Sequence, residues 1–207
     1  MRFNKARAFS YTEFLVSVAV LAIISTISVY SLNTSRSKEE IRTAQRVLAA
    51  DLRSLQARAL NAQNILFCTT ATGKKVVCES DTSLCAFACT QVPPAGVGVR
   101  LTEDSPTYLF FAKYDPATTD WRWTGSSETF LVRDLAKSGA SNVEISGFSV
   151  GTTAHIAFQR QNGGMKINAC PATCTNDSTL TISLRHVKTG DVKTVTVYAL
   201  TGRIVMD

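Results

Sequence analysis

The sequence predicts an α+β protein in which one long N-terminal helix is followed by a mostly antiparallel β head. Residues 9–62 contain neither Pro nor Gly, and the second half of this stretch carries apolar side chains at helical spacing. From Ile65 onwards the pattern changes to short apolar alternations separated by Gly, Pro, Asn and Asp, which is typical of strands. Of the 207 residues 45% are hydrophobic and 18% are charged, so we expect one globular domain in addition to the helix.

The first half of the predicted helix is apolar on all sides. Residues 14–30 are mainly apolar or small, and ~20 such residues cross the core of a bilayer. We therefore expect residues 9–32 to be embedded in a membrane. A single acid, Glu13, lies near the start of this segment. Placing an ionised carboxylate at the membrane centre costs ~2.5–3.5 kcal/mol of free energy, and less near the membrane edge, so Glu13 requires a compensating partner.

The second half of the predicted helix is amphipathic. Its apolar residues are spaced by threes and fours and form one stripe: Ile41, Ala44, Leu48, Leu52, Leu55, Ala59 and Ala62. We expect this stripe to pack against the head of the same chain.

The head is predicted to consist of short strands. They are expected at residues 65–70, 75–79, 96–101, 108–113, 129–133, 143–150, 155–160, 165–169, 180–186, 192–199 and 203–206. Residues 161–164 and 188–191 have the composition of hairpin turns.

The N-terminus resembles the class III signal of type IV pilins and pseudopilins. It reads Met-Arg-Phe-Asn-Lys-Ala-Arg-Ala-Phe-Ser-Tyr-Thr-Glu and leads into the apolar run. The resemblance implies that a prepilin peptidase cuts between Ala8 and Phe9, with Ala8 where the family usually has Gly. It further implies that Phe9 is N-methylated and that Glu13 pairs with the N-terminal amine of a neighbouring subunit. The expected domains are a cleaved leader 1–8, a spine helix 9–62 and a β head 63–207.

An ordinary secretory signal peptide is the alternative interpretation of residues 1–30. Its basic and apolar regions would be followed by a small-x-small cleavage site such as residues 28–31. The mature chain would then begin near Asn33.

The C-terminal third is similar to the GspH/FimT group of minor pilins and pseudopilins. The resemblance rests on strand-like segments from Ile145 onwards, on the ending Thr201-Gly202-Arg203-Ile204 and on Gln56-Ala57-Arg58 in the spine. It implies a structural subunit of a type IV pilus or related filament, assembled through its N-terminal helix with other pilin subunits. A DNA-binding minor pilin for DNA uptake and a type II secretion pseudopilin are the alternatives.

The positive charge of the chain is concentrated at its N-terminal side. The formal net charge is +6 and the pI about 9.1, but the leader and residues 36–58 hold most of the excess. A basic leader is expected on the cytoplasmic side of the inner membrane, which places the head outside the cytoplasm. The protein is expected first as a single-pass inner-membrane protein and then as part of a cell-surface or periplasmic filament. For the DNA alternative, the candidate contacts are Arg185, Lys188, Lys193 and Arg203.

Six cysteines on the exported side favour disulfides. Cys68 and Cys78 flank a turn centred near Gly73, so a bond across that hairpin is our preferred pairing. Local bonds between Cys85 and Cys89 and between Cys170 and Cys174 complete it. Other pairings stay open, as does a zinc site formed by the last two pairs.

The sequence does not predict an enzyme. It has two histidines, His155 and His186, both in strand-like segments, and it lacks the motifs of metalloproteases, serine hydrolases and phosphate-binding loops. Trp121 and Trp123 are expected to pack in the core or across strands. No cofactor and no metal ion is expected.

Overall fold

The computed structural model describes residues 11–73, 75–78, 85–115, 121–125, 128–149, 151–160, 164–170, 175–176 and 178–207, with the backbone alone at 168–170 and 175–176. The chain divides into two compact units, Met1–Glu39 and Glu40–Asp207. The described part of the first unit is entirely helical. The second unit, which we call the head, contains the rest of the helix and all the strands that the structure describes. The predicted leader lies outside the described residues.

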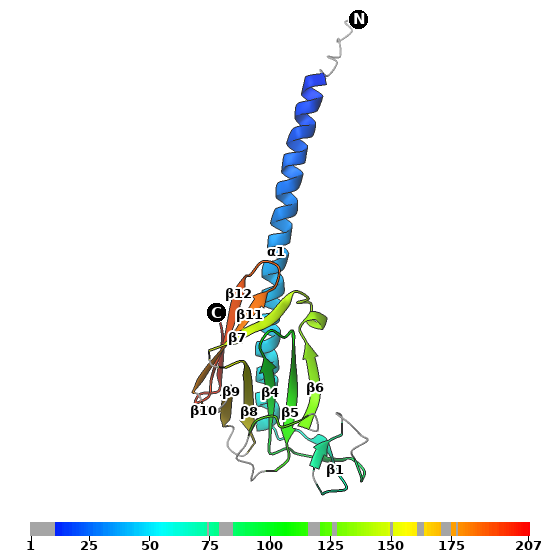
Figure 1. The fold of residues 1–207 in the computed structure, drawn as a ribbon, viewed down its shortest axis with the longest axis vertical. Helices are drawn as coiled ribbons and strands as arrows, with labels where there is room; N and C mark the ends of the chain where they lie inside the picture. Colours follow the sequence, from blue (N-terminus) through cyan, green and yellow to red (C-terminus); the bar gives the residue numbers. More distant parts are fainter. Residues whose placement is uncertain are drawn as a thin grey trace, which may run out of the picture. The chain divides into compact units, whose positions relative to one another are not determined.

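The predicted long helix is confirmed as α1 (Tyr11–Leu60), drawn blue to cyan in Figure 1. It ends two residues before the predicted end at 62. Ala62 adopts a φ of 49°, in the left-handed region where a helix stops. The N–H of Gln63 then bonds back to the carbonyl oxygen of Arg58 at 3.1 Å, which satisfies one of the last helical carbonyls.

The strands that follow form three antiparallel sheets. They are β1 (Ile65–Thr69), β2 (Lys75–Val77), β3 (Thr90–Val92), β4 (Gly96–Thr102), β5 (Thr107–Lys113), β6 (Thr129–Asp134), β7 (Val143–Phe148), β8 (Thr153–Gln159), β9 (Met165–Cys170), β10 (Thr175–Asn176), β11 (Thr179–His186), β12 (Val192–Tyr198) and β13 (Arg203–Met206), with a short 3-10 helix η3 (Ala136–Ser138) after β6. The sheet orders are β2-β1-β3, β10-β9-β8-β4-β5-β6 and β13-β12-β11-β7.

Each predicted strand is present, with ends that shift by one or two residues. Sequence reasoning missed β3 and β10. β3 is only three residues long and runs into Pro93 and Pro94, so it carries no alternating pattern; it is a strand because it pairs with β1. The predicted turn at 188–191 joins β11 to β12. Residues 161–163 of the other predicted turn lie outside the described residues.

The head has one main core, built from the helix stripe and the inner faces of the sheets. Ile41, Ala44, Leu48, Leu52, Leu55 and Ala59 are each at most 2% exposed, as the stripe predicts. Ala62, the last residue of the predicted stripe, lies beyond the end of the helix and is only partly buried. They belong to one cluster with strand residues such as Val99, Ile156 and Val197. The C-terminal part of α1 therefore packs with one face against the sheets, and Figure 1 shows this part, drawn cyan, behind β4 and β5.

Two of the three preferred disulfides, Cys68–Cys78 and Cys85–Cys89, are wrong, because the register of the β1–β2 hairpin differs from the predicted one. Cys68 lies opposite Val76, and the N–H of Cys78 bonds to Leu66. The two cysteines share a face of the hairpin but stand two positions apart. The segment from Cys85 to Cys89 is bonded to that face, giving Cys68–Cys85 and Cys78–Cys89 with Cα–Cα distances of 5.5 and 6.2 Å. Cys174 lies outside the described residues.

Candidate functional site

The N-terminal part of α1 presents an exposed apolar surface. Between residues 11 and 32 the large apolar side chains are exposed, and Glu13 is the only acid or base in this stretch. These side chains are Tyr11, Phe14, Leu15, Val16, Val18, Val20, Leu21, Ile23, Ile24, Ile27, Val29, Tyr30 and Leu32. Within the described part of the chain, α1 is the one helix long and apolar enough to cross a membrane, a test that a signal sequence also passes. A surface of this size marks a membrane or protein contact.

The hydroxyl groups of Ser17, Ser25, Thr26 and Ser28 are bonded within the helix and do not interrupt the apolar character of this segment. Ser17, Ser25 and Ser28 donate hydrogen bonds of 2.7–2.8 Å to the carbonyl oxygens four residues earlier. Thr26 and Thr34 bond to preceding carbonyls in the same way. Because these groups are satisfied within the helix, they need neither water nor a partner, and the helix suits a hydrocarbon environment.

Glu13 lies in the first turn of α1, where its carboxylate is favoured by the helix dipole. The predicted cleavage site, Ala8 and Phe9, lies outside the described residues.

In the head, the carboxylate of Asp51 joins α1 to two strands. Its Oδ2 accepts hydrogen bonds from the Tyr108 hydroxyl at 2.6 Å and from Nε of Arg133 at 3.0 Å, and its Oδ1 accepts one from Nη2 of Arg133 at 3.1 Å. Burial, followed by the neighbouring Asp51 carboxylate, raises the pKa of Tyr108 well above its usual value. The hydrogen bond to Asp51 also raises the pKa of Arg133. Sequence reasoning missed this cluster.

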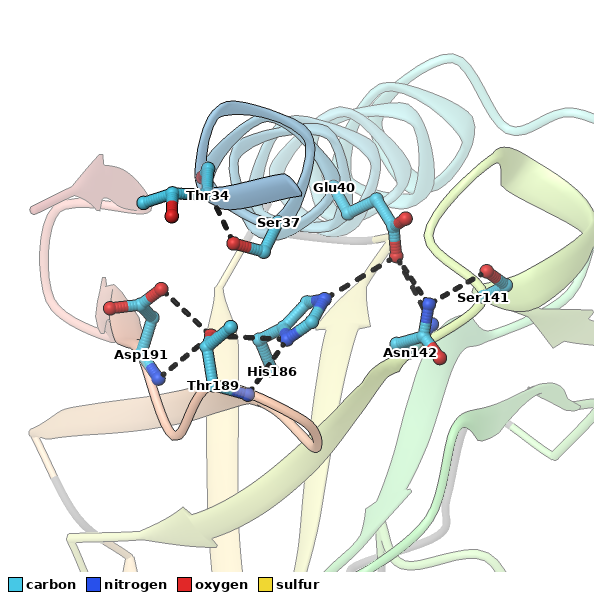
Figure 2. Close-up of polar contacts among 8 residues, drawn as sticks. All are labelled: Thr34, Ser37, Glu40, Ser141, Asn142, His186, Thr189 and Asp191. Carbon is cyan, nitrogen blue, oxygen red and sulfur yellow. Dashed lines mark hydrogen bonds and ion pairs between the residues drawn. The ribbon is translucent and has the colours of Figure 1, made fainter. Parts of the chain in front are cut away.

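A second polar cluster joins the helix to the other end of the head (Figure 2). Oε2 of Glu40 accepts hydrogen bonds from the backbone and side-chain N–H groups of Asn142 at 3.3 and 3.0 Å, and it lies 3.6 Å from Nε2 of His186. Nδ1 of His186 accepts the backbone N–H of Thr189 at 3.2 Å, so the proton of the neutral ring lies on Nε2, toward Glu40. His186 is 3% exposed, so it is packed inside the head.

The last strand is fixed to the helix through its backbone. Nε2 of Gln45 donates hydrogen bonds of 2.8 Å to the carbonyl oxygens of Thr194 and Asp207, and Arg53 donates one of 3.2 Å to Ile204. In the turn before β13, Gly202 has a φ of +64°, and a Cβ at this position would overlap the side-chain amide of Gln56. The Gly of the Gly-Arg ending is therefore favoured by its left-handed conformation, whereas the end of the Gln56 side chain could move to make room for a Cβ.

The candidate DNA contacts do not form one patch. Arg185 bonds to Glu144 at 2.6 Å and lies 3.7 Å from Asp104, and the bond to Glu144 raises its pKa. Lys188 is exposed in the β11–β12 turn. Lys193 lies opposite Leu184, on the core side of the sheet, whereas Arg203 lies opposite Tyr198 on the outer side. The five positions between Lys193 and Tyr198 correspond to about 17 Å along the strand.

The cysteine cluster does not offer a metal site in this form. The sulfurs of Cys68, Cys78 and Cys85 lie within 4.8 Å of one another, but each is in a disulfide and provides no thiolate. The zinc alternative, which required thiolates of Cys85 and Cys89, is contradicted for the same reason. Only the backbone of Cys170 is described.

The remaining residues that we considered for ligand binding are packed in the head. His155 is 7% exposed and meets the ring of Phe111 edge-on, with centroids 6.4 Å apart. Trp121 covers Gly96, and a Cβ on that glycine would overlap its ring. Trp123 lies under the guanidinium of Arg100, 4.3 Å from it. The packing role predicted for both tryptophans is thus confirmed.

Comparisons with known proteins gave one similar structure to report. No family model matches the chain, and no curated protein matches its sequence. The chain is similar to the crystal structure of the type IV minor pilin FimU from Pseudomonas aeruginosa strain PAO1, with a TM-score of 0.38 and 12% identity, over 82% of this chain and 90% of that one. Function is therefore inferred from the residues and elements of this chain.

Proposed function

We propose that this protein is a minor pilin or pseudopilin, a structural subunit of a type IV pilus or related filament. The observation that carries the proposal is the division of α1. Its N-terminal part exposes apolar side chains and carries a single carboxylate, whereas its C-terminal part is the buried spine of an antiparallel β head. A helix of this kind can anchor the head in a bilayer first and pack among other helices later.

Processing by a prepilin peptidase would prepare the helix for assembly. Cleavage between Ala8 and Phe9 removes the basic leader and leaves a new amine on Phe9, which is then N-methylated. The head lies outside the cytoplasm, because the leader carries Arg2, Lys5 and Arg7 next to the apolar segment. The disulfides of the head are consistent with an oxidising compartment.

Glu13 would direct assembly through its charge. An ionised carboxylate in the apolar segment costs up to ~2.5–3.5 kcal/mol, and the cost is smallest near the membrane edge. In a filament, the Phe9 amine of a neighbouring subunit would pair with this carboxylate and offset its desolvation. A subunit displaced along the helix bundle would leave the carboxylate without this partner.

Two related functions share the same helix. A type II secretion pseudopilin would use the same processing and assembly. A DNA-uptake pilin would in addition bind DNA through the head, but Arg185 is paired with acids and Arg203 lies far from Lys193, so the cations offer no continuous track for phosphates. Gel shifts at low salt test this alternative: weaker binding of Arg203→Ala and Lys193→Ala would favour it, and no binding by the unmutated protein would remove it.

Intact-mass measurement tests the proposed processing. The full chain is produced in membranes with and without a prepilin peptidase. We expect a peptidase-dependent product that begins at Phe9 and carries one methyl group. A product that begins near Asn33, with or without the peptidase, would instead identify residues 1–30 as an ordinary signal peptide and overturn the proposal.

A further inference from the structure

We propose that the edge strand β6 of the head is a docking site for an extended, acidic segment of another protein, which adds to the sheet as a further strand. The proposal concerns the head alone and does not depend on the function proposed above.

The first argument is the open edge of β6. Among the strands that the structure describes, this one is the last in its sheet and pairs with β5 alone. Leu135 N–H bonds to Pro106 C=O, toward β5, and antiparallel ladder bonds alternate along a strand. Val132 and Asp134 therefore direct their N–H groups away from β5. Such an edge accepts a further strand through main-chain hydrogen bonds.

The second argument is that this edge is accessible and apolar. Val132 is 62% exposed and Leu131 is 41% exposed. Natural edge strands are usually protected by charged side chains, by Pro or by a covering segment. In β6 the charged residues Arg133 and Asp134 stand only at the C-terminal end, so the middle of the strand is unprotected.

The third argument is a small groove between β6 and α1, with a volume of about 60 Å³. Its strand side includes Leu131 and Arg133, which lie opposite the buried residues Phe110 and Tyr108 and so face the helix. Alternate side chains of an added strand would point toward the same side, over this groove. The groove thus offers side-chain recognition next to the main-chain bonds.

The fourth argument is the charge of the groove, which selects an acidic occupant. Its charged lining residues are Asp51, Arg58 and Arg133. Arg133 is already paired with Asp51, whereas Arg58 is exposed and lies over the ring of Phe130, 5.7 Å from its centroid. Within the described residues, no carboxylate forms an ion pair with Arg58. A carboxylate on the groove side of the added strand would supply the negative partner of the Arg58 guanidinium.

The full chain in detergent micelles, with two labelled model peptides as probes, tests the proposal. The acidic probe is acetyl-Thr-Val-Glu-Val-Glu-Val-Thr-amide, and the basic probe has Lys in place of Glu. We expect the acidic probe to bind at least tenfold more tightly, measured by fluorescence anisotropy, and to slow hydrogen exchange in residues 129–134. Equal binding of the two probes, or binding without protection of β6, would overturn the proposal.

Two pairs of variants localise the site. Arg58→Glu should reverse the preference between the probes, while the control Arg42→Glu, an equal charge change at an exposed position of the same helix, should leave it unchanged. Val132→Pro removes an outward N–H and should abolish binding, while Val132→Thr keeps that N–H and should bind. Binding that survives both Arg58→Glu and Val132→Pro would refute the assignment. Protection of β6 that grows with protein concentration, without a probe, would instead identify a second copy of this chain as the occupant.

Discussion

The hydroxyl group of Tyr108 donates a 2.6 Å hydrogen bond to the carboxylate of Asp51, and this bond joins strand β5 of the head to the helix. Tyr108 is 3% exposed, and the same carboxylate accepts two bonds from Arg133. Three segments far apart in the sequence therefore meet at one side chain of α1.

Replacing Asp51 should destabilise the head more than removing the Tyr108 hydroxyl. Asp51→Ala leaves the Tyr108 hydroxyl without its acceptor, and we expect the free energy of unfolding to fall by about 1–3 kcal/mol. Tyr108→Phe removes one hydrogen bond and should cost about 1 kcal/mol. Chemical denaturation of the full chain in micelles measures both. Ser54→Ala, an exposed change on the same helix, is the control, and an Asp51→Ala variant as stable as that control would contradict the prediction.

The raised pKa of Tyr108 predicts a loss of stability at alkaline pH. Tyr108 ionises near pH 10 in the unfolded chain but well above that in the folded head, because it is buried beside Asp51. Its contribution is therefore complete below about pH 10 and declines as the pH rises above that value, by up to ~1.4 kcal/mol per pH unit. Unfolding of the wild type and of Tyr108→Phe from pH 8 to 11.5 should show a steeper decline in the wild type. Parallel curves of stability against pH for the two proteins would show that the Tyr108 phenol has the same pKa in the folded and the unfolded chain.

Gly202→Ala should be more destabilising than Gly190→Ala. Both glycines have a left-handed φ, +64° and +74°, so each substitution introduces backbone strain of about 1–2 kcal/mol. Only at Gly202 would the new Cβ also meet Gln56, whereas nothing lies within 4 Å at Gly190. Thermal unfolding should show the larger loss for Gly202→Ala. Adding Gln56→Ala to that variant should reduce the difference, and the absence of any such recovery would exclude the steric explanation.

Disulfide mapping should find Cys68 bonded to Cys85 and Cys78 bonded to Cys89. The closed loops span 17 and 11 residues, and loss of either bond is expected to lower stability by about 2–4 kcal/mol. Mass spectrometry of unreduced proteolytic fragments identifies the pairs. A Cys68–Cys78 fragment would show that the hairpin closes on itself and would refute the β1–β2 register.

Glu13→Ala should abolish filament assembly while membrane insertion and removal of the leader continue. The change removes the proposed partner of the Phe9 amine but makes the apolar segment easier to insert. Recovery of the protein in sheared filaments, compared with its amount in membranes, measures the effect. Ser17→Ala, which alters a neighbouring polar group bonded only within the helix, serves as the control. Normal assembly of Glu13→Ala would contradict the proposed pairing of Glu13 with the Phe9 amine.

Local patterns predicted the elements of this fold better than their mutual contacts. The stripe from Ile41 to Ala59 and the absence of Pro and Gly were enough to predict α1, because both act within one helix. The error at Cys68 and Cys78 has a local cause as well: Cys68 lies opposite Val76 instead of Cys78, a register two residues away from the predicted one, so the two cysteines share a face without facing each other.

Contacts between distant segments could not be predicted in this way. Asp51 has no sequence pattern that points to Tyr108 or Arg133, because the three meet only after β5 and β6 have packed on the helix. The candidate DNA contacts were chosen by charge and strand. Their separation depends on register and on the alternation of faces, which place Lys193 and Arg203 on opposite sides of one sheet.

The spacing of the polar bonds along α1 has a mechanical consequence. Glu40, Gln45, Asp51 and Arg53 contact the head at successive positions, with Gln45 and Arg53 both bonded to the C-terminal segment, so the contacts are distributed along the buried length of one helix. A force applied along the helix axis would load all of them together with the apolar stripe, in shear, whereas a force across the axis would open them one after another. Axial tension on the head would thus be shared among several contacts instead of falling on one.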